Sequence, residues 1–218
     1  MPITLISIAL ILWTTAACLL LAYLALNVFQ KDPGPEGWLA ALANWDGRRF
    51  IEIARHGYSG QDWFHRSLVG HFPLYPIFIW LAHFLFGNYE IASLVVSNLA
   101  YICAMFLFYR LVLTPYGSGT ALRAVFLLSV FPTVFILHAA YAESLFLMLV
   151  LAAFFSARKG HFLWAGIFGM LAVGSRFLGV VLLPALLVEY LHQKQFKWRS
   201  LRPDILYLAL VPLGLAAQ

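Results

Sequence analysis

Charged side chains are scarce in this sequence. Asp, Glu, Lys and Arg together make up 11% of its 218 residues, whereas 63% are hydrophobic and the mean hydropathy is +0.86. A water-soluble domain carries about 25% charged residues, so this composition excludes an ordinary soluble core. We therefore expect an all-α integral membrane protein: a single membrane domain over residues 1–218, built as a multispanning helical bundle.

Cysteine is nearly absent too. Cys18 and Cys103 both lie inside apolar runs, which excludes a disulfide framework and a cysteine-based metal site. Neither a metal triad nor a nucleotide-binding strand–helix pattern is apparent, so we expect no metal, no cofactor and no soluble nucleotide sugar. The net charge of +5 does not indicate a nucleic-acid partner, because the basic residues fall in short loops between apolar runs.

Long apolar runs define the expected helices. A membrane-spanning helix needs about 20 residues. About seven runs are candidate spans: 3–28, 91–112, 121–139, 142–157, 162–175, 177–192 and 205–218. The run 76–87 has about a dozen residues, and we expect it to form an interfacial or re-entrant helix instead.

The basic residues distinguish the two sides of this bundle. If 76–87 does not span, eight basic residues share the cytoplasmic side, as the positive-inside rule predicts; they are Arg110, Arg123, Arg158, Lys159, Lys194, Lys197, Arg199 and Arg202. The external side receives the loop 30–75 and the turns 138–144 and 175–176. The last run, 205–218, stops after 14 residues without a flanking charge, as expected for a helix cut short in a fragment of a longer protein.

Asp46 lies in the most polar part of the external loop. Apolar residues recur from Leu39 to Ile53 at helical spacing, which predicts an amphipathic helix on the membrane surface, with Asp46 on or beside its apolar face. A carboxylate held there suits a general base that removes a proton from an attacking hydroxyl. The alternative is that Asp46 caps a helix beginning at Gly47.

Two further parts of the loop have both a structural and a binding interpretation. Arg49 belongs to a basic cluster with Arg48, and arginine pairs bidentately with phosphate; ion pairing within a helix or attraction to anionic lipid would explain the same cluster. The segment 71–76 has two prolines three apart, which fix an extended turn at the lip of the bundle. Within it Tyr75 suits the aromatic belt of a membrane interface.

Two isolated charges stand at the other external turns. Glu143 opens an apolar helix, where a carboxylate is stabilised by the positive end of the helix dipole. An acid at membrane depth is otherwise costly and indicates a functional role. Arg176 stands between two apolar runs, against the positive-inside trend. We expect Arg176 to bind a phosphate or a carboxylate, and Glu143 is the candidate partner.

Four motifs in a fixed order resemble one known family. They are Trp45-Asp46-Gly47 with Ile53-Ala54-Arg55-His56-Gly57-Tyr58, Phe72-Pro73-Leu74-Tyr75-Pro76, Tyr141-Ala142-Glu143-Ser144-Leu145-Phe146 and Ser175-Arg176-Phe177-Leu178-Gly179. Together they resemble PIG-V, the second mannosyltransferase of glycosylphosphatidylinositol assembly, and its prokaryotic relatives. The resemblance runs from about residue 44 to 180 and corresponds to the N-terminal half of the family's longer members.

The resemblance implies a GT-C glycosyltransferase, a multispanning enzyme whose first external loop carries the catalytic acid. It implies transfer of a sugar, for this family mannose, with inversion from a polyprenyl-phosphate donor to a hydroxyl of a lipid, glycan or protein acceptor. Asp46 matches the family's loop aspartate and is expected to be the general base. The expected substrate-binding residues are Arg49, His71 and Arg176 at phosphate, Tyr75, and Glu143, which would orient the acceptor or pair with Arg176.

Two other classes of protein remain open. A lipid or sugar transporter or flippase would also expose polar residues, but it normally places charges near the bilayer midplane, and these runs are nearly free of charge. A non-catalytic or truncated membrane subunit would bind only lipid or a partner. In each case we expect a multi-pass protein, of the cell membrane in a prokaryote or of the endoplasmic reticulum in a eukaryote.

Overall fold

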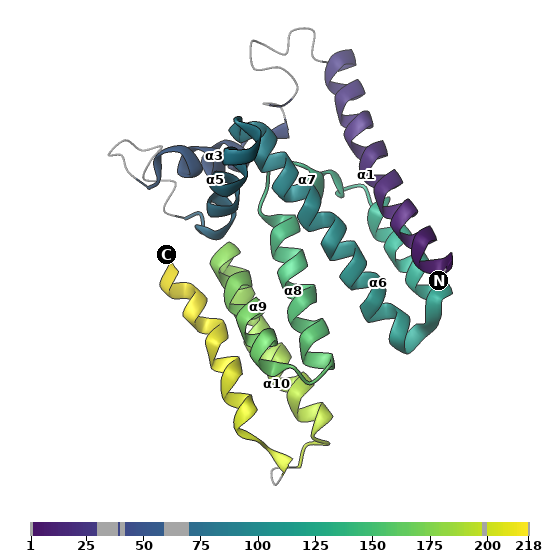
Figure 1. Cartoon of the computed structure of the whole chain (residues 1–218), viewed down its shortest axis with the longest axis vertical. Coiled ribbons are helices and arrows are strands. Elements are labelled where there is room, and N and C mark those ends of the chain that lie inside the picture. The colour runs from purple at the N-terminus through teal and green to yellow at the C-terminus, as the bar shows by residue number, and fades with distance from the viewer. Residues whose placement is uncertain (1, 30–38, 40–41, 59–69, 198–199, 218) are drawn as a thin grey trace.

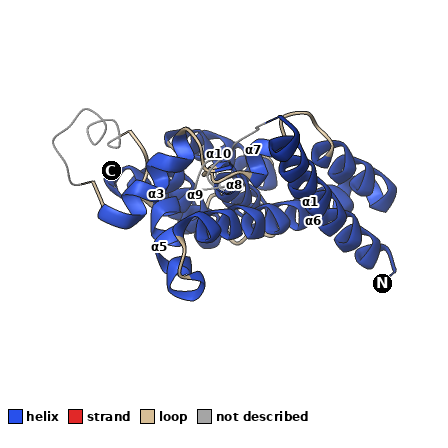
Figure 2. Ribbon diagram, turned by 90° about the horizontal axis from the view of Figure 1, so that it is seen from above, coloured by secondary structure: helices blue, strands red, loops and turns tan. Residues whose placement is uncertain are grey.

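The computed structural model describes residues 2–29, 39, 42–58, 70–197 and 200–217, and every regular element in these ranges is a helix (Figures 1 and 2). This confirms the all-α prediction. The predicted external loop 30–75 is described only in part. Its charged residues Lys31, Asp32, Glu36, Asp62 and Arg66 lie outside the described residues.

Ten helical elements are described, in the following chain order: α1 (Pro2–Phe29), α3 (Asp46–His56), α5 (Leu74–Phe86), α6 (Tyr89–Ser129), α7 (Phe135–His138), α8 (Glu143–Arg158), α9 (Phe162–Ser175), the 3₁₀ helix η1 (Phe177–Val181), α10 (Leu182–Gln193) and the 3₁₀ helix η3 (Pro203–Ala217). The predicted runs 3–28, 76–87, 142–157 and 162–175 correspond to α1, α5, α8 and α9. Their bounds agree to within about two residues, the usual scatter of helix ends.

Within the described ranges, α6 is the one helix long and apolar enough to cross a membrane by length and composition. It has 41 residues and bends at Gly117, where φ is 78° and ψ is 171°, two positions after Pro115. Shorter apolar helices are Ile11–Leu21, Leu74–Phe86, Phe162–Ser175, Phe177–Gln193 and Pro203–Ala216. The number of spans therefore stays a prediction.

The predicted span 121–139 is wrong as a single helix. The helix α6 ends at Ser129, and a series of turns follows, in which Val134 N donates to Phe131 O at 2.9 Å. Pro132 explains the break, because proline has no N–H to donate and its ring clashes with the preceding helical turn. Only the four residues of α7 continue toward the predicted end. The predicted runs 177–192 and 205–218 also differ, since the first begins as η1 and the second is η3.

The amphipathic helix predicted around Asp46 is shorter than expected. It begins at Asp46, after a turn in which Trp45 has φ 58°, so Asp46 is the first helical residue and the alternative that it caps a helix from Gly47 is wrong. The apolar face of α3 buries Phe50 and Ile53 and packs against α5 and α6. Asp46 lies off that face, with 56% of its side chain exposed.

The remaining helices form a bundle in which η3 packs on α9 rather than on its chain neighbour α10. The helix α1 lies against α6, α6 against α8, α8 against α9, and α9 against η3. The contact between α9 and η3 is very close: a Cβ on Gly166 would lie 2.1 Å from Tyr207 O. Small residues allow such close approach between helices in lipid. At one end of the bundle sit α3 and α5, on the side away from α1 (Figures 1 and 2).

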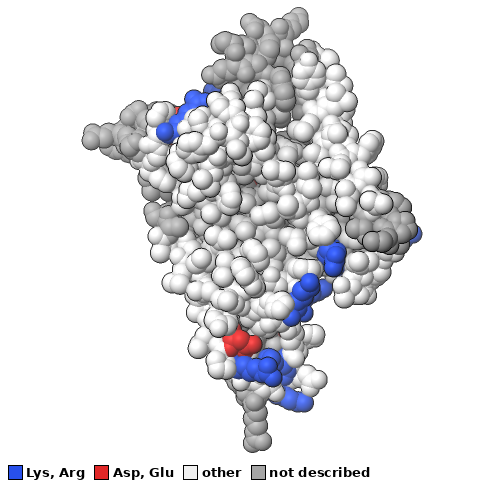
Figure 3. Space-filling model, viewed as in Figure 1, with Lys and Arg blue, Asp and Glu red and all other residues white. Residues whose placement is uncertain are grey.

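Charge is concentrated at the two ends of the bundle. Figure 3 shows a broad uncharged flank, with basic side chains gathered toward the end away from α3 and a smaller group beside α3. Arg158 and Lys159 lie at the C-terminal end of α8 and Lys194 follows α10, whereas Glu143 and Arg176 lie at the opposite ends of α8 and α9. This distribution agrees with the predicted two-sided arrangement of the basic residues.

Candidate functional site

A cavity at the α3 end of the bundle collects residues from three distant segments. Its volume is about 220 Å³, and it is lined by Asp46, Phe50, Gly70, His71, Phe72, Ser175, Arg176, Phe177 and Leu178. Asp46 opens α3, His71 precedes α5, and Arg176 joins α9 to η1. Three of the residues predicted from sequence therefore line one cavity.

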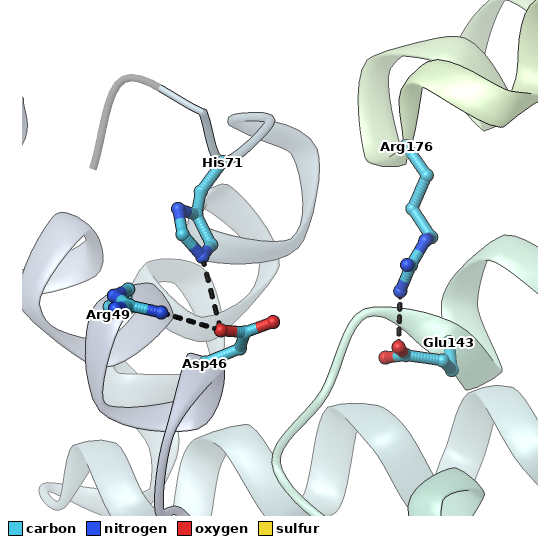
Figure 4. Close-up of polar contacts among 5 residues, drawn as sticks. All are labelled: Asp46, Arg49, His71, Glu143 and Arg176. Carbon is cyan, nitrogen blue, oxygen red and sulfur yellow. Dashed lines mark hydrogen bonds and ion pairs between the residues drawn. The ribbon is translucent and has the colours of Figure 1, made fainter. Parts of the chain in front are cut away.

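The carboxylate of Asp46 is approached from one side by an arginine and a histidine. Its Oδ1 accepts a hydrogen bond from Arg49 Nη1 at 2.8 Å and lies 3.6 Å from His71 Nε2. Its second oxygen, Oδ2, points away from both groups toward Glu143 and Arg176 (Figure 4). One oxygen thus fixes the orientation of the carboxylate, and the other faces the open side of the site.

Gly47 allows the start of α3 to reach the turn before α8. A Cβ at this position would lie 3.0 Å from Ala140 O and 3.4 Å from Ala140 Cβ. The same turn is tied to the chain before α3, because Ala140 N donates to Leu42 O at 3.0 Å. The glycine that follows Asp46 therefore sets how closely the carboxylate approaches the segment that carries Glu143.

His71 is held on two sides. Its ring meets the ring of Phe50 edge to face, with the centroids 5.1 Å apart, and its backbone oxygen accepts a hydrogen bond from the Tyr58 hydroxyl at 2.6 Å. Partial burial raises the pKa of that tyrosine. The His71 side chain is 14% exposed. These contacts direct Nε2 of His71 toward Asp46.

A second ion pair faces Asp46. Arg176 Nη1 donates to Glu143 Oε1, so the partnership predicted from sequence is present (Figure 4). Glu143 is the first residue of α8, and Arg176 has extended backbone with φ −153° and ψ 138°. About a third of each side chain is exposed. The pair is therefore accessible to a ligand while its geometry is still restrained by burial.

Tyr141 belongs to the site, although it was not among the predicted site residues. Burial raises the pKa of its hydroxyl, and the negative charges of Asp46 and Glu143 raise the pKa further. The hydroxyl is therefore within electrostatic reach of both carboxylates. Its backbone oxygen accepts a hydrogen bond from Ser97 Oγ at 3.1 Å, which ties the turn to α6. In the sequence, Tyr141 is marked by its position two residues before Glu143, at the start of the motif 141–146.

Tyr75, predicted to bind substrate, is not among the described residues that line the cavity. Its side chain is fully buried, and its hydroxyl lies 3.0 Å from Ser93 O and 2.7 Å from Ser97 Oγ. The reason is the start of α5 at Leu74, which directs position 75 inward onto α6. There its ring packs edge to face on Phe50, with centroids 5.1 Å apart. Tyr75 supports the site from behind.

Arg49 touches the site through Asp46. Among the described residues that line the cavity Arg49 does not appear, and its guanidinium is engaged by the carboxylate of Asp46. Contact between Arg49 and a phosphate stays a prediction. No group of three or more His, Cys, Asp or Glu residues in the described part of the chain is placed to hold a metal ion.

The arrangement supplies an oriented carboxylate and a guanidinium on opposite sides of one cavity. A carboxylate can accept a proton from a hydroxyl, and a guanidinium can bind a phosphate or carboxylate with two parallel hydrogen bonds. The cavity can therefore receive a ligand that carries both an ionisable hydroxyl and an anionic group.

Comparison with known proteins agrees with this chemistry. The model of the dolichyl-phosphate-mannose-protein mannosyltransferase family matches residues 70–217, about two thirds of the chain, a range that includes His71, Glu143 and Arg176 and begins after Asp46. No curated protein and no solved structure matches the chain significantly. The chain belongs to the dolichyl-phosphate-mannose-protein mannosyltransferase family, a family of membrane glycosyltransferases of the GT-C type.

Proposed function

We propose that this protein transfers mannose from a polyprenyl-phosphate donor to a hydroxyl of a lipid, glycan or protein acceptor, with inversion at the anomeric carbon. One observation carries the proposal: a carboxylate and a guanidinium, those of Asp46 and Arg176, belong to residues that line the same cavity. Membership of a mannosyltransferase family supports the reaction class.

Asp46 is the general base of the proposed reaction. The acceptor oxygen forms a bond to the anomeric carbon while its proton passes to Oδ2 of Asp46. Arg49 and His71 hold Oδ1 and keep the carboxylate in place. A positioned base of this kind contributes about 10²–10⁴-fold to the rate.

Arg176 binds the departing phosphate. The bond from the anomeric carbon to the phosphate oxygen breaks, its electron pair stays on that oxygen, and the lipid phosphate leaves with an additional negative charge. A fixed guanidinium stabilises this charge most strongly in a site shielded from water. Glu143 keeps Arg176 oriented before the donor binds, through the ion pair between them.

The motifs from Trp45 to Gly179 support a closer relationship to PIG-V and its prokaryotic relatives within this superfamily. On this proposal the chain is a multi-pass protein of about seven spans, with the cavity on the external side. The membrane is the cell membrane in a prokaryote and the endoplasmic reticulum membrane in a eukaryote. Asp46 precedes the range that the family model matches, so its role rests on the motif and on the geometry of the cavity.

The test is sugar transfer by the Asp46→Asn variant in membranes supplied with polyprenyl-phosphate mannose. We expect the rate to fall about 10²–10⁴-fold with unchanged expression, because the amide is isosteric but does not accept the proton. Asp204→Asn is the matched control, since Asp204 bonds Tyr190 at the opposite end of the bundle. Full activity in Asp46→Asn would exclude it as the base, and no transfer by the unmodified protein would contradict the proposed reaction itself.

A further inference from the structure

Ser175 is a buried polar residue at the edge of the cavity. It is the last residue of α9, 1% of its surface is exposed, and its Oγ makes no hydrogen bond to any residue that the structure describes. A serine in a helix ordinarily bonds a carbonyl of the preceding turn, and an unbonded buried hydroxyl is unfavourable. Because Ser175 also lines the cavity, a ligand hydroxyl is the natural partner for it.

A second unbonded atom belongs to the neighbouring ion pair. Glu143 Oε1 accepts from Arg176, whereas Glu143 Oε2 is buried and has no hydrogen-bond partner in the described part of the chain. A carboxylate oxygen accepts hydrogen bonds and donates none, so this atom requires a donor. Arg176 is therefore a neighbour of both residues. Ser175 precedes it in the chain, and Glu143 is its ion-pair partner.

The two atoms are distinctive among the described side chains. Three buried side-chain nitrogen or oxygen atoms lack a partner there, and the third is Nε2 of His138. His138 lies away from the cavity lining, and its other ring nitrogen, Nδ1, lies 2.8 Å from Asn98 Oδ1. The two remaining atoms belong to the immediate neighbours of Arg176: Ser175 also lines the cavity, and Glu143 is the ion-pair partner of Arg176.

We propose that Ser175 and Glu143 form a subsite for one sugar hydroxyl, the one on the carbon next to the anomeric carbon. The subsite would thereby select the configuration at this neighbouring carbon. The inference rests on the proposed function, in which Arg176 holds the phosphate. The hydroxyl next to the anomeric carbon is the sugar hydroxyl nearest to that phosphate. Ser175 adjoins Arg176 in the chain, and Glu143 is bonded to it. The sugar hydroxyl donates to Glu143 Oε2 and accepts from Ser175 Oγ.

The experiment pairs a change in the protein with a change in the donor. Transfer by the unmodified protein and by Ser175→Ala is measured with polyprenyl-phosphate mannose and with its 2-deoxy analogue. We expect Ser175→Ala to lower kcat/KM about tenfold for the mannose donor, the loss typical of one substrate hydrogen bond. The 2-deoxy donor lacks the recognised hydroxyl. With this donor we expect Ser175→Ala to change kcat/KM by less than about twofold.

A stability measurement separates binding from folding. Ser175→Ala removes a hydroxyl that bonds none of the residues within the described ranges, so we expect Tm to stay the same or rise. Ser129→Ala is the control: Ser129 is also buried, but its Oγ accepts from the Tyr101 hydroxyl at 2.9 Å, so its loss should lower Tm by roughly 2–4 °C. The control should leave the preference between the two donors unchanged.

Each outcome has one meaning. An equal loss with both donors, or no loss with either, would overturn the sugar subsite while leaving the proposed transfer intact. A fall in Tm for Ser175→Ala as large as that for Ser129→Ala would show that Ser175 bonds within the protein, which also overturns the subsite. Absence of transfer by the unmodified protein, with either donor, would instead count against the proposed function.

Discussion

The hydroxyl of Tyr75 provides a test of how the core supports the site. It lies 3.0 Å from Ser93 O and 2.7 Å from Ser97 Oγ, which in turn lies 3.1 Å from Tyr141 O. Each of the two hydroxyls owns one proton. Together they therefore support two of the three contacts at any moment. Tyr75→Phe removes one proton and leaves Ser97 able to donate to Tyr141 O.

The expected cost of Tyr75→Phe is therefore one hydrogen bond. One bond of this kind contributes about 1 kcal/mol to stability. The phenylalanine ring retains the edge-to-face contact with Phe50, so no cavity is created. For a protein of 150–250 residues, about 1 kcal/mol lowers Tm by roughly 2–4 °C. Because the hydroxyl does not reach the cavity, we expect the rate of sugar transfer below Tm to be unchanged.

The assay is thermal unfolding in detergent, followed by tryptophan fluorescence, alongside the transfer rate at a temperature where both proteins are folded. Tyr116→Phe is the matched control, since its side chain is 69% exposed and Tm should not move. An unchanged Tm for Tyr75→Phe together with a tenfold or larger loss of transfer would refute the reasoning. Tyr75 would then contact substrate, as the sequence first indicated.

Two further predictions concern the geometry around Asp46. Gly47→Ala adds a Cβ 3.0 Å from Ala140 O, which requires a shift of a few tenths of an ångström. We expect kcat to fall with little change in KM, because small displacements of a catalytic group are costly. An unchanged kcat would contradict a close fit between α3 and the turn that contains Ala140. In Asp46→Asn the pKa of Tyr141 should fall, because one of the two negative charges that raise it is removed while Glu143 remains. The measurement is tyrosinate absorbance during an alkaline titration. Subtracting the titration of the same protein with Tyr141→Phe isolates the signal of Tyr141. An unmoved midpoint would contradict the proximity of Tyr141 and Asp46.

The helices could be predicted well where a local pattern determines them. The uninterrupted apolar runs gave α1, α8 and α9 nearly complete, because burial in a bundle or in lipid follows directly from hydropathy. The run 121–139 failed since hydropathy does not register the effect of Pro132 on helical hydrogen bonds. Hydropathy also does not separate an α-helix from a 3₁₀ helix, as η3 illustrates.

The site could be predicted where charge complementarity was sufficient. The pairing of Glu143 with Arg176 followed from two opposite charges on the same expected side. The burial of Tyr75 could not be predicted, because a tyrosine suits both a membrane interface and a buried hydrogen-bonded position, and the start of α5 decides between them. Ser175 could not be singled out from sequence, since its significance depends on which hydrogen bonds it does not make after folding.

The two sides of the cavity are far apart along the chain, and this bears on how the protein is made. Asp46 is synthesised first, and at ~5–20 residues per second the roughly 130 positions that separate it from Arg176 take roughly 7–26 s to follow. During that interval Asp46 is present, but the arginine that completes the cavity is not. On the proposed mechanism, in which both residues act, the order of synthesis keeps the nascent chain inactive until α9 and the segment after it have been made.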